Sequence, residues 1–405
     1  MTNRYIHMLS WGLLYGFFSL FIVLVYYTLD SKKLRVKVKL SSSIDNKIAS
    51  FPLSDAVIYL IIASVSAFRL NTGSDYYNYY MYYNNIKSVY SSPKEIISNS
   101  QFGYFLLSWI IKSITDNEYA IFIVIAFFSY FCLFRILRKE KIKDMSCALL
   151  CYMFLGFYAC SNNILKQYIA MIFLMCAYLS FINKLYIRAI IYSLICVSFH
   201  YSSIFILFII LIVRNIKPTF YKYTLSIVGG ITTGLMLNTA LRLLTTFVPS
   251  AQGYSKYIDW RRNNQFRLVA AVFAMFLVYA VLIFFIIKHK NSIKQENQNR
   301  YNEIILLIVG LGINAIALRL WIISRIAIYF YQFIILILPT MFSVINNKSK
   351  KINLKLFLYT IMFLYMIFSS IFLGENEYFS YNTIFSGDHV LSDIEYNALH
   401  GWYKK

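Results

Sequence analysis

The first apolar run of the chain is WGLLYGFFSLFIVLVYYTL, which covers residues 11–29 and contains no charged side chain. A run of about twenty residues is enough to cross the hydrocarbon core of a bilayer, which is about 30 Å thick. The basic residues that follow are Lys32, Lys33, Arg35, Lys37, Lys39 and Lys47. Because Lys and Arg accumulate in cytoplasmic loops, this pattern predicts a first transmembrane helix with its N-terminus outside the cytoplasm.

The composition extends this interpretation to the whole chain. Of its 405 residues, 59% are hydrophobic and only 14% are charged. Soluble domains average about 45–50% apolar and about 25% charged residues, so soluble enzyme folds are excluded. The sequence predicts an all-α, polytopic integral membrane protein whose residues 1–405 form a single membrane domain with about twelve transmembrane helices. The predicted spans are 11–29, 53–69, 119–137, 145–161, 164–182, two within 186–213, 223–247, 268–287, 303–318, 326–343 and 354–373.

Three segments interrupt the simple alternation of spans and loops. Residues 71–118 are predicted to form a periplasmic loop whose apolar run, Phe102–Ile114, is too short to cross alone and is interpreted as an interfacial or re-entrant helix. Residues 374–405 are predicted to be a polar periplasmic tail. The stretch 186–213 is long for one helix and short for two. The sequence leaves open a hairpin with its apex near His200 or a single crossing, and the basic residues favour the hairpin slightly.

The net charge of +22 constrains the partners of the protein. In a soluble chain it would suggest nucleic acid, but here the basic residues lie in short loops between apolar spans, so no nucleic-acid partner is expected. Anionic membrane lipids are expected instead, because each Lys or Arg near an anionic leaflet is worth about 1 kcal/mol. The six cysteines show no CxxC pair and the five histidines no ligand pair. The pattern therefore predicts neither a disulfide framework nor a metal site.

Cationic residues predicted at the outer ends of spans are the strongest functional signal. Arg69 ends the second span, Lys166 opens the fifth, and Arg319 and Arg325 stand between two later spans. Guanidinium and ammonium groups at a partly dry surface suit a phosphate or diphosphate. In a continuous helix Arg319 and Arg325 would lie on roughly opposite faces, and Arg325 is then the stronger candidate. The alternative is that these cations snorkel or anchor helix ends at the membrane interface.

Two residues are candidates for a general base. Asp75 begins the tyrosine-rich segment DYYNYYMYYNNI, residues 75–86, and His200 lies between Phe199 and Tyr201 in an apolar stretch. Asp75 could instead be a helix cap or a solvated loop acid, and His200 a hydrogen-bonded packing residue. The Tyr and Asn side chains of the segment suit sugar rings, but equally an aromatic belt at the membrane interface.

Five short strings occur in the chain in this order: RLNTGSDYYNYY (69–80), QFGYFLL (101–107), NNILKQYIAM (162–171), SFHYSSIF (198–205) and SRIAIYF (324–330). A sixth, SYNTIF, occupies residues 380–385. In order and spacing they resemble the EpsG family of bacterial polysaccharide polymerases, which are similar to Wzy-type O-antigen and capsule polymerases. Two positions depart from that pattern. Lys166 stands where the family typically has Arg, and Gln101 stands where an acid is frequent, so a catalytic acid is not expected there.

The resemblance implies a GT-C-like glycosyltransferase bundle in the bacterial inner membrane, with its active site facing the periplasm. The implied reaction moves the growing glycan from undecaprenyl diphosphate to the non-reducing end of a new undecaprenyl-diphosphate-linked repeat unit, without a cofactor. A chain-length regulator protein is a candidate partner. The catalytic candidates are Asp75 and His200. The candidate substrate-binding residues are Arg69, Lys166, Gln167, Arg319, Arg325 and Tyr329.

Other functions fit part of the same pattern. A flippase or other transporter of lipid-linked oligosaccharides also has about twelve spans, but such folds usually contain internal repeats, and the sequence shows none. A polysaccharide ligase would transfer the finished chain to lipid A core. A membrane acyltransferase with His200 as base is less favoured, because no acidic residue follows His200 closely.

Overall fold

The structure is a computed structural model, and it describes residues 2–42, 45–86, 101–247, 261–372, 381–392 and 395. The chain divides into two compact units, which are treated separately below. The N-terminal unit consists of Ile6–Lys141, Gly156–Ser203 and Glu375–Lys405. The C-terminal unit consists of Met1–Tyr5, Ile142–Leu155 and Ile204–Gly374.

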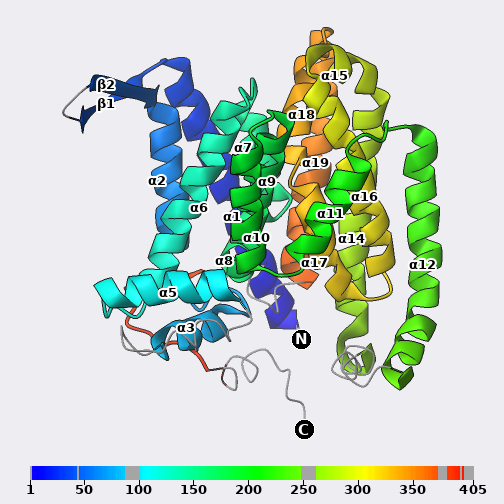
Figure 1. Cartoon of the computed structure of the whole chain (residues 1–405), viewed down its shortest axis with the longest axis horizontal. Coiled ribbons are helices and arrows are strands. Elements are labelled where there is room, and N and C mark those ends of the chain that lie inside the picture. Colours follow the sequence, from blue (N-terminus) through cyan, green and yellow to red (C-terminus); the bar gives the residue numbers. More distant parts are fainter. Residues whose placement is uncertain are drawn as a thin grey trace. The chain divides into compact units, whose positions relative to one another are not determined.

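The chain is a mainly helical, multi-pass membrane protein, as the composition predicts (Figure 1). Six helices of the described residues are long and apolar enough to cross a bilayer, or up to eight spans if each of two bent helix pairs counts as one. The six long helices are α1 (Thr2–Ser31), α6 (Ala120–Lys139), α9 (Leu165–Ile182), α14 (Arg261–Lys288), α16 (Gln298–Ala317) and α19 (Lys348–Phe372). The bent pairs are α7 (Met145–Phe154) with α8 (Phe157–Asn163), and η2–α17 (Trp321–Tyr331) with α18 (Ile334–Ser343).

The predicted number of twelve crossings is not confirmed. Four apolar helices of the described residues have only 10–17 residues. At 1.5 Å per residue, helices of this length do not reach across about 30 Å of hydrocarbon on their own. They are α2 (Leu53–Ala67), α5 (Phe102–Ile114), α10 (Tyr186–Phe199) and α11 (Ser203–Val213).

The stretch 186–213 is not one continuous helix, because α10 ends at Phe199 and α11 begins at Ser203. The short apolar run predicted as an interfacial helix is helical over the same residues, Phe102–Ile114, as α5. This helix lies crosswise to α6 of its own unit in Figure 1, which is the orientation that an interfacial helix requires.

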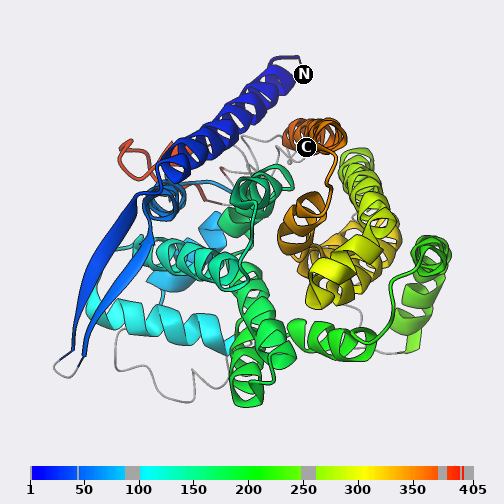
Figure 2. The ribbon, with the colours of Figure 1, turned by 90° about the horizontal axis from the view of Figure 1, so that it is seen from above.

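The N-terminal unit also contains strands that the hydropathy pattern did not predict. The basic segment after α1 forms an antiparallel hairpin of β1 (Arg35–Ser42) and β2 (Asp45–Pro52), in which Arg35 pairs with Pro52. The two strands run side by side away from the helices of the unit (Figure 2). The hairpin leads directly into α2. An alternation of basic residues and Val at 35–39 is the sequence signal that a strand was possible here.

An ion pair joins three helices of the N-terminal unit. Arg138, in the last turn of α6, donates through Nε and Nη2 to the two carboxylate oxygens of Asp55 in the first turn of α2. Arg138 Nη2 also donates to the hydroxyl of Tyr26 on α1, at 2.8 Å. A bidentate guanidinium–carboxylate pair fixes orientation as well as distance. The three helices are therefore held in register at this end.

A tight turn sets α9 and α10 antiparallel. Lys184 has a left-handed backbone (φ 61°), and Leu185 N donates to Ser180 O while Lys184 N donates to Phe181 O. These are the two hydrogen bonds of a Schellman motif, which ends a helix and reverses the chain. Along the pair, Cys196 Sγ lies 3.1 Å from Ala170 O, and the rings of Phe173 and Tyr192 have centroids 6.0 Å apart.

In the C-terminal unit, small residues let α12 (Phe220–Phe247) approach α16 closely. A Cβ added to Gly230 would meet the Gly312 carbonyl and lie 2.6 Å from Ala315 Cβ. Ser226 Oγ donates to Ile308 O at 2.6 Å. Small residues and hydroxyl groups at such an interface are typical of helix packing in membranes. The hydrophobic effect does not drive helices together in lipid, so close backbone packing and hydrogen bonds stabilise the pair instead. The unit also contains α15 (Lys290–Glu296) and a buried ion pair, Arg300–Glu303, at the start of α16.

Candidate active site

In the N-terminal unit, the segment after α2 is held by the far end of the sequence. Arg69 and Leu70 form β3, which pairs antiparallel with β4 (Asn382–Thr383), so that Arg69 lies opposite Thr383. Ile384 N donates to Phe68 O at 3.0 Å, and the rings of Phe68 and Phe385 are 5.3 Å apart. The strings RLNTGSDYYNYY and SYNTIF, remote in sequence, are therefore adjacent in space.

The turn that follows β3 is clamped by two consecutive asparagines at the end of α8. Ser66 Oγ donates to Asn162 Oδ1 at 2.5 Å, and Asn163 Oδ1 accepts from the backbone N–H of Asp75 at 2.9 Å. Gly73 has φ +93°, and a Cβ at this position would lie 2.6 Å from Asn163 Oδ1 and 3.0 Å from Asn163 Cα. Only glycine avoids both the backbone strain and the clash.

Arg69 is buried at the centre of this arrangement, with 1% of its surface exposed. Its Nη1 donates to Ser66 O, and its Nη2 donates to Asn162 O at 3.1 Å. The guanidinium lies 5.1 Å from the centroid of the Phe122 ring. Among the described residues no carboxylate pairs with it. Burying a cation is costly unless hydrogen bonds compensate it. The carbonyl oxygens and aromatic faces around Arg69 therefore stabilise its positive charge.

Two tyrosines complete the surroundings of Arg69. Tyr76, in α3 (Tyr76–Asn84), donates through its hydroxyl to Arg69 O at 3.2 Å and stacks on Phe122 with centroids 4.3 Å apart. Burial raises the pKa of Tyr76, so its hydroxyl stays a neutral donor. Burial also raises the pKa of Tyr381, although the nearby Arg69 opposes the shift. The Tyr76 hydroxyl therefore holds the backbone of Arg69, while its ring lies 5.9 Å from the guanidinium.

Lys166, in the first turn of α9, is the accessible cation of the same region. Its ammonium lies 5.0 Å from the ring centroids of Tyr82 and Tyr104 and 5.6 Å from that of Tyr79. We call Tyr79, Tyr82 and Tyr104 the tyrosine cage. Each cation–π contact contributes roughly 0.5–2 kcal/mol. Lys166 is half-buried, and Asp75 belongs to the same region, because its backbone N–H is bound by Asn163 at the end of the helix that precedes α9.

His200 lies just beyond the C-terminal end of α10, with an extended backbone (φ −154°, ψ 104°). In the antiparallel pair α9–α10, residue 170 meets residue 196 and residue 173 meets residue 192. Extending this register by one helical turn puts His200 at the level of Lys166. The start of α5 packs here too, because a Cβ on Gly103 would lie 2.8 Å from Phe199 Cδ2.

The structure thus brings together several of the predicted residues of the N-terminal unit. Arg69 and Asp75 are joined through the Asn162–Asn163 pair, and Lys166 follows that pair on the next helix. Gln167, in contrast, is 4% exposed and belongs to the core of the unit.

The remaining predicted residues lie in the C-terminal unit. Arg319 and Arg325 are not on one continuous helix, because α16 ends at Ala317 and η2 (Trp321–Ile323) precedes α17 (Ser324–Tyr331). Arg319 is exposed in the connecting turn. The Arg325 guanidinium lies 5.8 Å from the Trp321 ring, and Tyr329 is 1% exposed. The chain therefore breaks between the predicted spans 303–318 and 326–343, so the continuous helix considered for the two arginines does not form.

The sequence analysis predicted no specific role for Asn162 and Asn163 or for the three tyrosines of the cage. Asn162 and Asn163 form a polar pair between two apolar runs, 147–160 and 168–182. Such groups are costly in a membrane unless they are hydrogen-bonded, so the pair was a usable signal. The cage had no local signal, because Tyr104 comes from a different helix than Tyr79 and Tyr82.

A family model described as the EpsG family matches residues 53–383. The chain belongs to the EpsG family. The EpsG match begins at the first residue of α2 and ends at Thr383, the residue paired with Arg69. Both units therefore contain EpsG sequence, while α1 and the whole β1–β2 hairpin precede it. Membership assigns the chain to membrane proteins of polysaccharide synthesis with a polymerase-like role. No curated protein and no solved structure matches the chain.

Proposed function

We propose that this EpsG protein is a membrane glycosyltransferase that polymerises lipid-linked oligosaccharide repeat units. It transfers the growing glycan from undecaprenyl diphosphate to a hydroxyl at the non-reducing end of a new undecaprenyl-diphosphate-linked unit. The observation that carries the proposal is Lys166, a half-buried ammonium held in the tyrosine cage on the helix that follows the Asn162–Asn163 pair, to which Asp75 is hydrogen-bonded. A fixed cation and a carboxylate on neighbouring segments suit a reaction with an anionic leaving group and an acceptor that loses a proton.

In the proposed step, the acceptor hydroxyl oxygen attacks the anomeric carbon of the donor sugar. The bond between that carbon and the diphosphate oxygen breaks, and undecaprenyl diphosphate leaves with the electron pair. The acceptor proton passes to Asp75 or His200. General base catalysis of this kind is worth roughly 10²–10⁴-fold. Lys166 would stabilise the charge that develops on the leaving diphosphate, where one well-placed donor is typically worth roughly 10²–10³-fold.

Arg69 has a different role in this proposal. Because it is 1% exposed and donates to two backbone carbonyls, it acts as a positioning residue that fixes the turn from Leu70 to Asp75. In the C-terminal unit, the exposed Arg319 and the half-buried Arg325 are proposed to bind an anionic part of a lipid-linked substrate.

The proposal requires an active site that faces the periplasm, since the lipid-linked units are polymerised after their export. It also requires a bacterial inner membrane as the location. A chain-length regulator remains a proposed partner, because the reaction as written contains no step that ends elongation.

The test is polymerisation by the purified full chain, supplied with synthetic undecaprenyl-diphosphate repeat units, with the product read as a ladder on a gel. We expect a ladder from the wild type and its loss in Lys166→Ala. The matched control is Lys112→Ala, because Lys112 also lies over a tyrosine of the same unit, Tyr83, at 5.2 Å and is paired with Asp116. That control should keep the ladder.

A cell-based experiment separates this proposal from a flippase. In a strain carrying Lys166→Ala, a polymerase defect leaves single repeat units exported and attached to the surface glycolipid. Accumulation of the units on the cytoplasmic side would contradict the proposal, as would a full ladder from the variant in vitro.

A further inference from the structure

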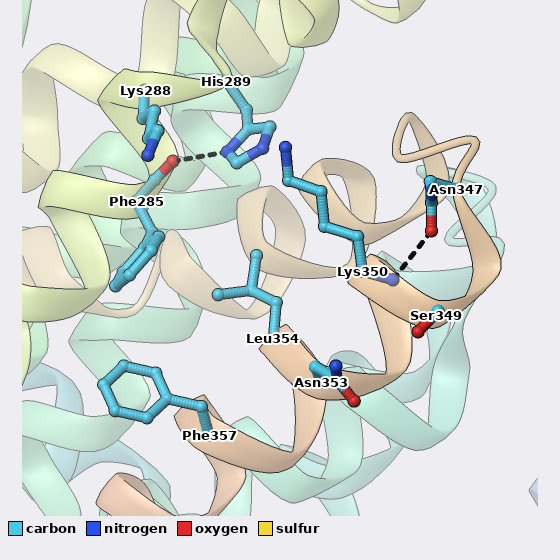
Figure 3. Close-up of a pocket in the computed structure, with 9 residues that line it drawn as sticks. All are labelled: Phe285, Lys288, His289, Asn347, Ser349, Lys350, Asn353, Leu354 and Phe357. Carbon is cyan, nitrogen blue, oxygen red and sulfur yellow. Dashed lines mark hydrogen bonds between the residues drawn. The ribbon is translucent and has the colours of Figure 1, made fainter.

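A pocket of about 490 Å³ lies in the C-terminal unit, and none of its lining residues belongs to the proposed reaction (Figure 3). It is formed by the C-terminal end of α14, the residue that follows it, and the first turns of α19. Its lining residues are Phe285, Lys288, His289, Asn347, Ser349, Lys350, Asn353, Leu354 and Phe357.

The rim of the pocket is cationic and lacks any carboxylate. Lys288 and Lys350 form no ion pair with the residues that the structure describes. Other lysines of the same unit do, since Lys143 pairs with Glu296 and Lys355 pairs with Asp144. The side chain of Lys350 extends toward the imidazole of His289 (Figure 3). The positive charge of this rim is therefore not used within the described protein.

The polar groups of the rim are held in place. His289 Nδ1 lies 2.9 Å from Phe285 O, so this nitrogen carries the proton and donates. Asn347 Oδ1 accepts from Lys350 N at 2.9 Å and caps the first turn of α19. The first-turn N–H groups of a helix and the positive end of its dipole favour an anion at this position.

The inner wall of the pocket is apolar. Phe285 and Phe357 contact edge to face, with ring centroids 5.9 Å apart, and Leu354 lies on the same side (Figure 3). Both α14 and α19 are candidate membrane spans, and the lysines stand where each span meets its polar end. A cationic rim above an apolar wall at the end of two spans matches a phospholipid, whose phosphate lies at the interface and whose chains lie deeper.

We infer that this pocket binds the phosphate headgroup of an anionic phospholipid, with its acyl chains against Phe285, Leu354 and Phe357. If residues 186–213 form the hairpin that the basic residues favour, Lys288 and Lys350 lie in cytoplasmic loops, and this topology assigns the site to the inner leaflet. Phosphatidylglycerol is the probe, because it carries the phosphate and a net negative charge. Phosphatidylcholine has the same phosphate and chains but no net charge, and inorganic phosphate has no chains.

Binding is measured by native mass spectrometry of the detergent-solubilised full chain titrated with each lipid. We expect phosphatidylglycerol to bind more tightly than phosphatidylcholine. The double variant Lys288→Gln/Lys350→Gln should bind phosphatidylglycerol roughly thirtyfold more weakly than the wild type, because each cation contributes about fivefold to the affinity. Lys143→Gln is the matched control, because its charge is already paired with Glu296. It should bind as the wild type does.

Three results would overturn the inference. The first is equal affinity for the two lipids, and the second is an unchanged affinity in the double variant. The third is full displacement of phosphatidylglycerol by millimolar inorganic phosphate, which would assign the rim to a free phosphate rather than to a lipid. Circular dichroism of each variant shows that the helices are intact.

Discussion

The side-chain amide of Asn71 forms two hydrogen bonds with the segment that begins at His389, 318 residues further along the chain. Asn71 Nδ2 donates to His389 O at 3.0 Å, and Asn71 Oδ1 accepts from Leu391 N at 3.0 Å. Together with the pairing of β3 and β4, these bonds place the described part of the C-terminal tail beside the turn that carries Asp75. The tail is thus part of the candidate active site.

We predict that Asn71→Ala releases residues 389–391 from the turn. Two hydrogen bonds are lost, which costs about 1–3 kcal/mol, and the left-handed backbone of residue 71 (φ 53°) becomes less favourable. Hydrogen exchange of a peptide covering these residues measures the change and should show faster exchange. Asn71→Asp keeps the acceptor and should give an intermediate rate. Unchanged exchange in Asn71→Ala would contradict the pairing.

Gly73→Ala should disrupt the turn between β3 and α3. The substitution combines a positive φ with a Cβ placed 2.6 Å from Asn163 Oδ1, and a cost of about 2–4 kcal/mol is expected. Gly387→Ala is the matched control, because Gly387 also has a positive φ, +80°, but nothing lies within 4 Å of its added Cβ. The midpoint temperature of thermal unfolding should be much lower for Gly73→Ala than for Gly387→Ala. Equal losses would mean that contact with Asn163 is unimportant.

Lys166→Arg should retain polymerisation within about tenfold of the wild type. Arg keeps the charge, stacks on aromatic rings, and adds a donor fork that suits a diphosphate. Lys166→Ala should lose roughly 10²–10³-fold. The initial rate of ladder formation checks both values. Equal loss of activity in the folded Arg and Ala variants would show that the reaction does not depend on a positive charge at residue 166.

Asp55→Asn should destabilise the N-terminal unit more than Glu296→Gln destabilises the C-terminal unit. The carboxylate of Asp55 is mostly buried, at 10% side-chain exposure, so its removal leaves Arg138 without its partner at a cost of about 1–3 kcal/mol. The Lys143–Glu296 pair is exposed and is worth less than about 1 kcal/mol. Midpoints of thermal unfolding in one detergent compare the two. The reverse order would refute the role given to Arg138.

Cysteine labelling tests the predicted orientation of the C-terminal unit. We expect Arg319→Cys to react with a membrane-impermeant maleimide from the periplasmic side, and Lys350→Cys to react only after the membrane is opened. The experiment needs a background without the six native cysteines, all of which are free thiols. Labelling of both positions from one side would contradict the topology and the leaflet assigned to the lipid pocket.

The candidate site was only partly accessible to sequence reasoning. Arg69, Asp75 and Lys166 stood out because charged residues are costly near a membrane and are retained for a reason. The different roles of Arg69 and Lys166 could not be predicted from the sequence, because they depend on how deeply each side chain is buried. Arg69 is fully buried and Lys166 only half-buried, although both were predicted as ligands of the same diphosphate. In the same way, the pairing of Thr383 with Arg69 could not be predicted from the strings RLNTGSDYYNYY and SYNTIF.

Local properties of the sequence determined the membrane character of the protein, the long apolar helices, the extent of α5 and the membership of the EpsG family. Each of these depends on residues that are neighbours in the chain, because insertion into a bilayer is decided by the apolarity of a short continuous segment. Tertiary structure alone decided the breaks in the helices, the β3–β4 pairing, the asparagine clamp and the tyrosine cage. These depend on hydrogen bonds and ring contacts between segments far apart, and such contacts are favourable only once packing has removed competing partners.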